Sequence, residues 1–177
     1  RKAEEKRLAA EAAIAAYGNI TTEAKAATEE IQKQVEAAKA AIPASASEDT
    51  IEALQARVNT LTQLQAEQNK KHNALQELLN TANTNYNDVL GEKGVTAVKD
   101  EAETAVKALA TALKTLEESI QSQKKQAVQD YLDYLKGLLY KKSDSDHTTT
   151  IQTIQNYSDN MDTLAVWSQE TEKLNKN

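Results

Sequence analysis

The chain has no cysteine and no phenylalanine, and it has only one proline, one tryptophan and four glycines among 177 residues. The lack of cysteine excludes disulfides, zinc–thiolate sites and thiol nucleophiles, but it leaves the compartment open. Few prolines and glycines mean few turns. The remaining composition is rich in alanine, glutamate, lysine, glutamine and leucine, which favour helix. The sequence therefore predicts a mostly helical chain.

The charge of the chain argues against one class of partner. Its net charge is −6, and no segment is basic enough to bind a phosphate backbone, so we expect no nucleic-acid partner. No apolar run approaches the roughly 20 residues that span a bilayer. The sequence begins at Arg1, without an initiator methionine or an apolar signal region. We take this beginning to indicate a processed form or a segment of a longer protein.

Apolar residues recur at alternating intervals of three and four, which places them in a stripe along one face of a helix. We call such a stripe a seam. The seam is interrupted at Pro43 with residues 45–49, at Gly91 to Gly94, and at residues 143–147. It predicts helices over residues 1–42, 48–90, 95–142 and 148–175. Short connections force neighbouring helices to run antiparallel. The expected fold is all-α: a single domain over residues 1–177, built as an elongated antiparallel helical bundle of three long helices plus one shorter helix.

The seam positions are the expected core of this bundle. In the first helix they are Ala10, Ile14, Tyr17, Thr21, Ala24, Thr28, Ile31, Val35, Ala38 and Ile42. In the second they are Ile51, Leu54, Val58, Leu61, Gln65, Gln68, His72, Leu75, Leu79, Ala82, Tyr86 and Val89. In the third they are Val95, Val98, Ala102, Ala105, Leu109, Ala112, Leu116, Ile120, Gln123, Ala127, Tyr131, Tyr134 and Leu138.

Local signals mark the helix ends. Ser45 with Glu48, or Asp49 with Glu52, fits a capping box, in which a capping residue is followed three residues later by a carboxylate that bonds back to its backbone N–H. Gly91 suits a left-handed cap after the second helix, which we expect to fray or bend before that residue. Gly94 permits the reversal into the third helix.

Few residues suggest chemistry. His72, on the seam beside two glutamines, is either a proton-sensitive switch or ligand contact, or part of a hydrogen-bonded layer that sets helix register; we favour the layer. Residues 144–147 resemble the start of a calcium loop but lack its glycine and its final glutamate, so a capped turn is expected. We predict no metal, no cofactor and no catalytic centre, and therefore no enzyme.

Two features are candidates for modification or exposure. Asn19 and Asn156 begin N-glycosylation sequons, although both lie in predicted helices, where such triplets more often arise by chance. The first and third connections share one pole of the predicted bundle and would form its exposed tip. The residues of this tip are Pro43, Ser45, Ser47, Asp144, Asp146, Thr148, Thr149 and Thr150.

Alanine- and glutamate-rich stretches run through the first helix, at residues 24–30 (AKAATEE) and 35–41 (VEAAKAA). With the long up-and-down layout, they resemble the glutamate/alanine-rich helical surface proteins of African trypanosomes, which are related in shape to the variant surface glycoproteins. The resemblance implies a helical-bundle ectodomain on the extracellular face of the plasma membrane. It also implies a C-terminal lipid (GPI) anchor outside this chain and a dense coat of neighbouring copies. It assigns no functional residue.

The function expected from these observations is that of a non-enzymatic, structural cell-surface coat protein that shields the membrane of a parasite. One alternative is a ligand- or host-binding receptor or adhesin module, with a cleft beside the polar middle of the second helix. The other alternative is an intracellular coiled-coil tether. A single-chain bundle that remains a folded monomer would argue against that tether.

Overall fold

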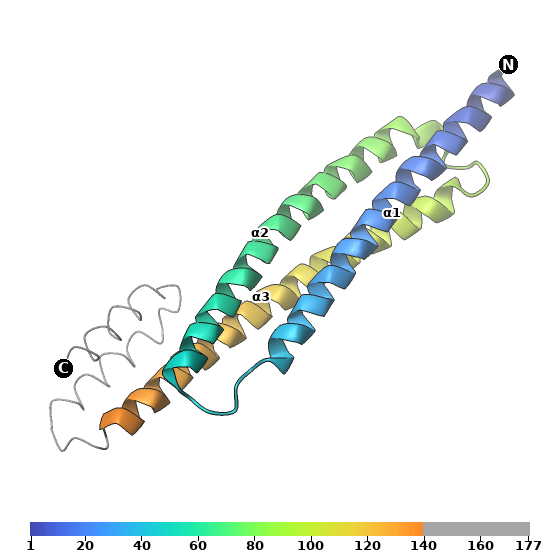
Figure 1. Cartoon of the computed structure of the whole chain (residues 1–177). Helices are drawn as coiled ribbons and strands as arrows, with labels where there is room; N and C mark the ends of the chain where they lie inside the picture. Colours follow the sequence, from blue (N-terminus) through green and yellow to red (C-terminus); the bar gives the residue numbers. More distant parts are fainter. Residues whose placement is uncertain (140–177) are drawn as a thin grey trace. The chain divides into compact units, whose positions relative to one another are not determined.

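The computed structural model describes residues 1–139, which form helices and no strand (Figure 1). Helix α1 spans Lys2–Ala40, α2 spans Glu48–Asn85, a short 3₁₀ helix η1 spans Asn87–Val89, and α3 spans Val95–Leu139. The all-α prediction is confirmed for this part of the chain. The predicted helix over 148–175 lies outside the described residues, as does the predicted end of the third helix at 142.

The helices contribute to two compact units. The first unit comprises Arg1–Ala37 and Gln63–Glu117, and the second comprises Ala38–Thr62 together with the described residues from Glu118 to Leu139. Helices α2 and α3 each supply residues to both units. We describe the two units separately below.

In the first unit, α1 and α2 run antiparallel, as do α2 and α3 (Figure 1). The Tyr17 hydroxyl donates a 2.7 Å hydrogen bond to Asn83 Oδ1, and the rings of Tyr17 and Tyr86 lie 6.2 Å apart. These contacts join the first half of α1 to the end of α2. The core of α3 forms a stripe wider than a single seam, because residues beside the seam are also buried. Its buried members here are Val95, Ala102, Ala105, Val106, Leu109, Ala112, Leu113 and Leu116.

The second unit has a core shared between α2 and α3. Ile51 and Leu54 of α2 cluster with Ala127, Tyr131 and Leu132 of α3, all at most 5% exposed. Partly buried side chains at positions 128 and 134 pack against this cluster. Because early residues of α2 contact late residues of α3, the two helices run antiparallel in this unit as well.

The seam predicts the core of α2 well and that of α1 less well. In α2 all apolar seam positions except the half-buried Tyr86 are buried, whereas Gln65, Gln68 and His72 are half-buried. In α1, the predicted core residues Ile14 and Ile42 are 39% and 40% exposed. Ile42 follows the end of the helix. The core of α1 also uses neighbouring positions that the seam omitted, namely Ala13, Ile20 and Ala27.

The reversal between α2 and α3 corrects one expectation. Helix α2 ends at Asn85 rather than at residue 90, and η1 completes the segment before Gly91. Only Gly94 has a positive φ, at 88°, among the described residues. The predicted left-handed cap at Gly91 is therefore wrong, since the 3₁₀ turn already closes the end of α2. The reversal at Gly94 is confirmed.

The start of α2 corrects another expectation. Ser47 Oγ accepts a 3.2 Å hydrogen bond from the backbone N–H of Thr50, and the two hydroxyl oxygens lie 2.6 Å apart. Ser47 therefore caps the helix, and the predicted caps at Ser45 and Asp49 are wrong. A cap must precede the helical residues, and Asp49 already lies inside α2.

Candidate functional site

A surface groove lies in the first unit. It has a volume of about 480 Å³ and is lined only by α1 and α3. Its lining residues are Lys25, Thr28, Glu29, Asp100, Glu101, Thr104, Ala105 and Ala108. Such a volume falls within the range of about 300–1,000 Å³ that is usual for small-molecule sites.

The floor of the groove is made of short side chains. Ala105 is buried, Thr28 is half-buried, and the other two short residues of the lining are exposed. Thr28 does not offer its hydroxyl proton to a ligand, because Oγ1 donates a 2.9 Å hydrogen bond to the carbonyl of Ala24 within α1. The floor is therefore shallow and largely apolar.

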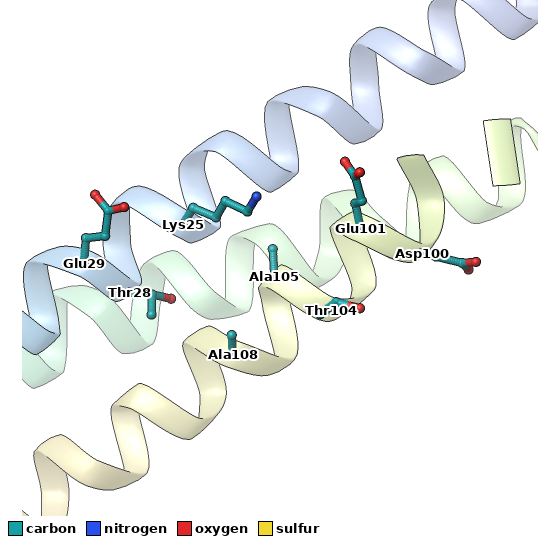
Figure 2. A pocket seen from close by; sticks show the side chains of 8 residues that line it. All are labelled: Lys25, Thr28, Glu29, Asp100, Glu101, Thr104, Ala105 and Ala108. Carbon is teal, nitrogen blue, oxygen red and sulfur yellow. The ribbon is translucent and has the colours of Figure 1, made fainter. Parts of the chain in front are cut away.

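Two opposite charges face the space between the helices. Figure 2 shows Lys25 reaching from α1 and Glu101 reaching from α3 toward this space, whereas Glu29 and Asp100 point away from it. Lys25 and Glu101 make no ion pair in the described part of the chain. An ammonium and a carboxylate thus stand on opposite sides of an apolar floor.

The sequence did not reveal this groove. Its charged members had the pattern of solvent-exposed helix faces, and the predicted cleft was placed at the polar middle of the second helix. The groove instead lies between α1 and α3. A seam analysis follows one helix at a time, so it does not show which two helices leave a gap between them.

The polar middle of α2 contacts α3. The side-chain amide of Gln65 donates a hydrogen bond to a carboxylate oxygen of Glu117 on α3. The amide oxygen of Gln68 is buried and accepts no hydrogen bond within the described residues. His72 is half-buried on the same face. The Gln65–Glu117 bond is the kind of cross-helix contact expected of a register layer.

A second polar cluster surrounds Tyr17, which is fully buried. Besides its bond to Asn83, Tyr17 lies near the ion pair of Lys99 and Glu103, whose Nζ and Oε1 are 2.8 Å apart. Burial raises the pKa of Tyr17, and the hydrogen bond that Lys99 donates to Glu103 raises the pKa of Lys99. The sequence placed Tyr17 in the core but gave no signal that Asn83 would be its partner.

The predicted tip residues are only partly described. Ser45 is exposed, while Pro43 and Ser47 are half-buried and Ser47 serves as a helix cap. The remaining tip residues, Asp144, Asp146, Thr148, Thr149 and Thr150, lie outside the described residues. The prediction that the two halves share one pole therefore depends on residues outside the described part of the chain.

Only the first of the two predicted sequons lies within the described residues. Asn19 is an exposed residue of α1, but Ile20 is buried and Thr21 is 8% exposed, with its hydroxyl donating to the carbonyl of Tyr17 at 3.1 Å. A glycan on Asn19 would project from the surface, while the hydroxyl that completes the sequon is engaged inside the bundle. The second sequon, at Asn156, lies outside the described residues.

Within residues 1–139 no group of acidic or histidine side chains is arranged to hold a metal ion. None of the described helices has the length and apolar character to cross a membrane. Comparison of the chain with family models, with curated proteins and with solved structures gave no match.

Proposed function

We propose that this chain is a non-enzymatic structural protein of a cell-surface coat. In this proposal an elongated antiparallel bundle, completed by a fourth helix over residues 148–175, stands among neighbouring copies and shields the membrane. A C-terminal lipid anchor outside this chain would hold it to the extracellular face.

One observation supports the proposal above the others. In each unit most buried positions are filled by aliphatic and aromatic side chains, from Tyr17 and Leu109 in one to Leu54 and Tyr131 in the other. The charged side chains lie mainly on exposed faces. Long helices packed in this way suit a scaffold that covers area, and the resemblance to the glutamate/alanine-rich surface proteins points to the same role.

Surface labelling tests this proposal. The gene with its native ends is expressed in its own cells and detected with an antibody against residues 1–139, with and without permeabilisation. We expect staining of intact cells that a phosphatidylinositol-specific phospholipase C removes. Staining that requires permeabilisation would contradict the coat and favour the intracellular tether. Surface staining that resists the lipase would contradict the lipid anchor.

The groove supports a second candidate, a ligand-binding module. Lys25 and Glu101 would bind the carboxylate and the ammonium of a zwitterion, while the apolar floor accepts its side chain. An apolar amino acid such as leucine has this chemistry. NMR titration of the chain with leucine should then shift signals of the groove residues.

Two variants of the groove and one control variant distinguish specific leucine binding from a nonspecific change in the NMR signals. Ala108→Trp fills the groove from an exposed position, and Glu101→Gln removes the carboxylate; both should abolish the leucine-dependent shifts. Ala110→Trp, at an exposed position of α3 that does not line the groove, should retain them. Unchanged shifts in Ala108→Trp would contradict this candidate.

A further inference from the structure

Helix α1 has a second heptad face that no part of the described structure covers. Its positions alternate by four and three, as in a coiled-coil seam, and all are exposed. They are Leu8, Ala12, Ala15, Asn19, Thr22 and Ala26. We refer to these six residues as the outer face. Leu8 alone leaves 52% of its surface in water, more than most large apolar residues of the described chain.

We propose that the outer face is a self-association site, at which α1 pairs in parallel with α1 of a second copy. In heptad terms, Leu8, Ala15 and Thr22 occupy d positions and Ala12, Asn19 and Ala26 occupy a positions. In a parallel two-stranded pair each residue meets its own counterpart, so that Leu8 covers Leu8 of the second copy.

The charges beside the outer face suit a second copy. In a parallel pair, the g position of one helix contacts the e position that follows five residues later on the other. Lys25 is such a g residue and Glu30 the matching e residue. Two symmetry-related ion pairs form when Lys25 turns from the groove toward Glu30 of the second copy, which also accepts a 3.0 Å hydrogen bond from Gln34 of its own helix. Every other e–g contact over residues 4–37 joins at least one uncharged residue, including Gly18 with Glu23 and Glu11 with Ala16. No like charges are therefore brought together.

Asn19 selects the parallel direction. A single asparagine at an a position meets its counterpart in a parallel pair, and the two amides satisfy each other by hydrogen bonding. In the antiparallel alternative, Asn19 would face Ala15 and its amide would have no partner. That alternative would pair Glu11 with Lys25 of the second copy, and Glu11 lies 2.6 Å from Arg7 in its own helix just as Glu30 accepts a 3.0 Å hydrogen bond from Gln34, so the charges alone do not decide the direction.

The proposed pairing has one consequence for modification. Asn19 lies at the centre of the outer face, so a glycan on it would hold two α1 helices apart. Pairing and N-glycosylation at Asn19 are therefore mutually exclusive. Pairing would also give neighbouring copies in the proposed coat a direct contact with a common orientation. The proposed pairing does not depend on that coat, because the pairing is tested with the purified chain in solution.

Sedimentation equilibrium of the 177-residue chain at increasing concentration tests the pairing. We expect a monomer–dimer equilibrium that Ala15→Lys abolishes, because the substitution places a charge at the middle of the face without lowering helix propensity much. Ala74→Lys makes the same change at an exposed position of α2 and should leave the dimer intact. Circular dichroism confirms that both variants remain helical.

Charge exchange tests the direction. Lys25→Glu should weaken the dimer by roughly tenfold, because two attractions become two repulsions. Lys25→Glu with Glu30→Lys restores opposite charges only in the parallel pair, so this double variant should recover the dimer. Lys25→Glu with Glu11→Lys restores them only in the antiparallel pair and should remain weak.

Three results would overturn the proposal. The first is a chain that stays monomeric over the whole concentration range. The second is a dimer that Ala15→Lys leaves unchanged, which would place the interface elsewhere. The third is recovery by the Glu11 combination instead of the Glu30 combination, which would establish antiparallel pairing. Each of these results leaves the surface-labelling test of the coat unaffected.

Discussion

The two faces of α1 have the same spacing but different environments. On the inner face Tyr17, Ala24 and Ile31 are at most 1% exposed, whereas Leu8 on the outer face is 52% exposed. Adjacent residues differ in the same way, since Ala27 is 2% exposed and buried whereas Ala26 is exposed to solvent. Heptad spacing thus shows which faces of a helix are able to pack. Larger side chains and the positions of α2 and α3 determine which face is packed within one chain.

The largest expected difference between the faces comes from truncating an aliphatic side chain. Ile31→Ala removes a buried side chain and should lower the free energy of unfolding by about 2–5 kcal/mol. Leu8→Ala removes an exposed one and should change it by less than about 0.5 kcal/mol. Urea denaturation of both variants at low protein concentration measures the difference. Equal losses would show that the outer face is already covered within the monomer.

Enlarging adjacent alanines should give the next largest difference. Ala27→Leu forces a large side chain into the packed interior and should cost about 1–3 kcal/mol. Ala26→Leu places the same group in solvent and should leave the monomer nearly unchanged, while strengthening the self-association of the outer face. Urea denaturation reports the first effect and sedimentation reports the second. A stabilised Ala27→Leu monomer would reveal a void at the inner face.

The hydroxyl of Tyr17 should contribute less than the ring. Tyr17→Phe keeps the buried ring but removes the hydrogen bond to Asn83, and we expect a loss of about 1 kcal/mol in the free energy of unfolding. Tyr17→Phe combined with Asn83→Ala should cost less than the sum of the two single changes, because they share one interaction. Strict additivity in this cycle would show that the bond contributes nothing.

The smallest effect is expected at high pH. Burial raises the pKa of Tyr17 above its ordinary value of 10.0, so the unfolded chain loses this proton first as the pH rises. The stabilisation is complete below about pH 10 and is lost as the pH rises through the raised pKa of the folded state. Tyr17→Phe should flatten this decline in unfolding free energy above about pH 10.

Tyr134 is the matched control for the pH experiment. Its pKa is also raised by burial, but it belongs to the second unit. Tyr134→Phe should therefore remove its own share of the decline and leave that of Tyr17. An unchanged pH dependence in Tyr17→Phe would contradict the assignment of this titration to Tyr17.

Much of the described fold follows from the apolar spacing. The breaks at Pro43 and at Gly91 to Gly94 correctly separated three helices, and the α2 seam from Ile51 to Val89 was correct at nearly every apolar position. These features are local, because a proline or a run of seam residues restricts the backbone wherever the other helices lie. The details of the helix ends were less predictable. Several serines and acidic residues near position 47 were equally suitable caps, and the backbone geometry selected Ser47.

The candidate sites were less predictable than the fold. The groove depends on the separation of α1 and α3, and the bond from Tyr17 to Asn83 joins residues 66 positions apart. Ile14 fits the seam but lies where the neighbouring helices leave it 39% exposed. None of these outcomes is contained in the spacing of one segment.

The amino-acid sequence by itself determined the helical character of residues 1–139, the approximate bounds of the helices and most positions of the buried seams. These depend on backbone propensity and on the periodicity of apolar residues, which act within a few turns. Only the tertiary structure decided which of the two faces of α1 is buried, which residue caps α2, and where a groove remains. Those outcomes depend on contacts between segments distant in sequence, and such contacts arise only when the helices pack.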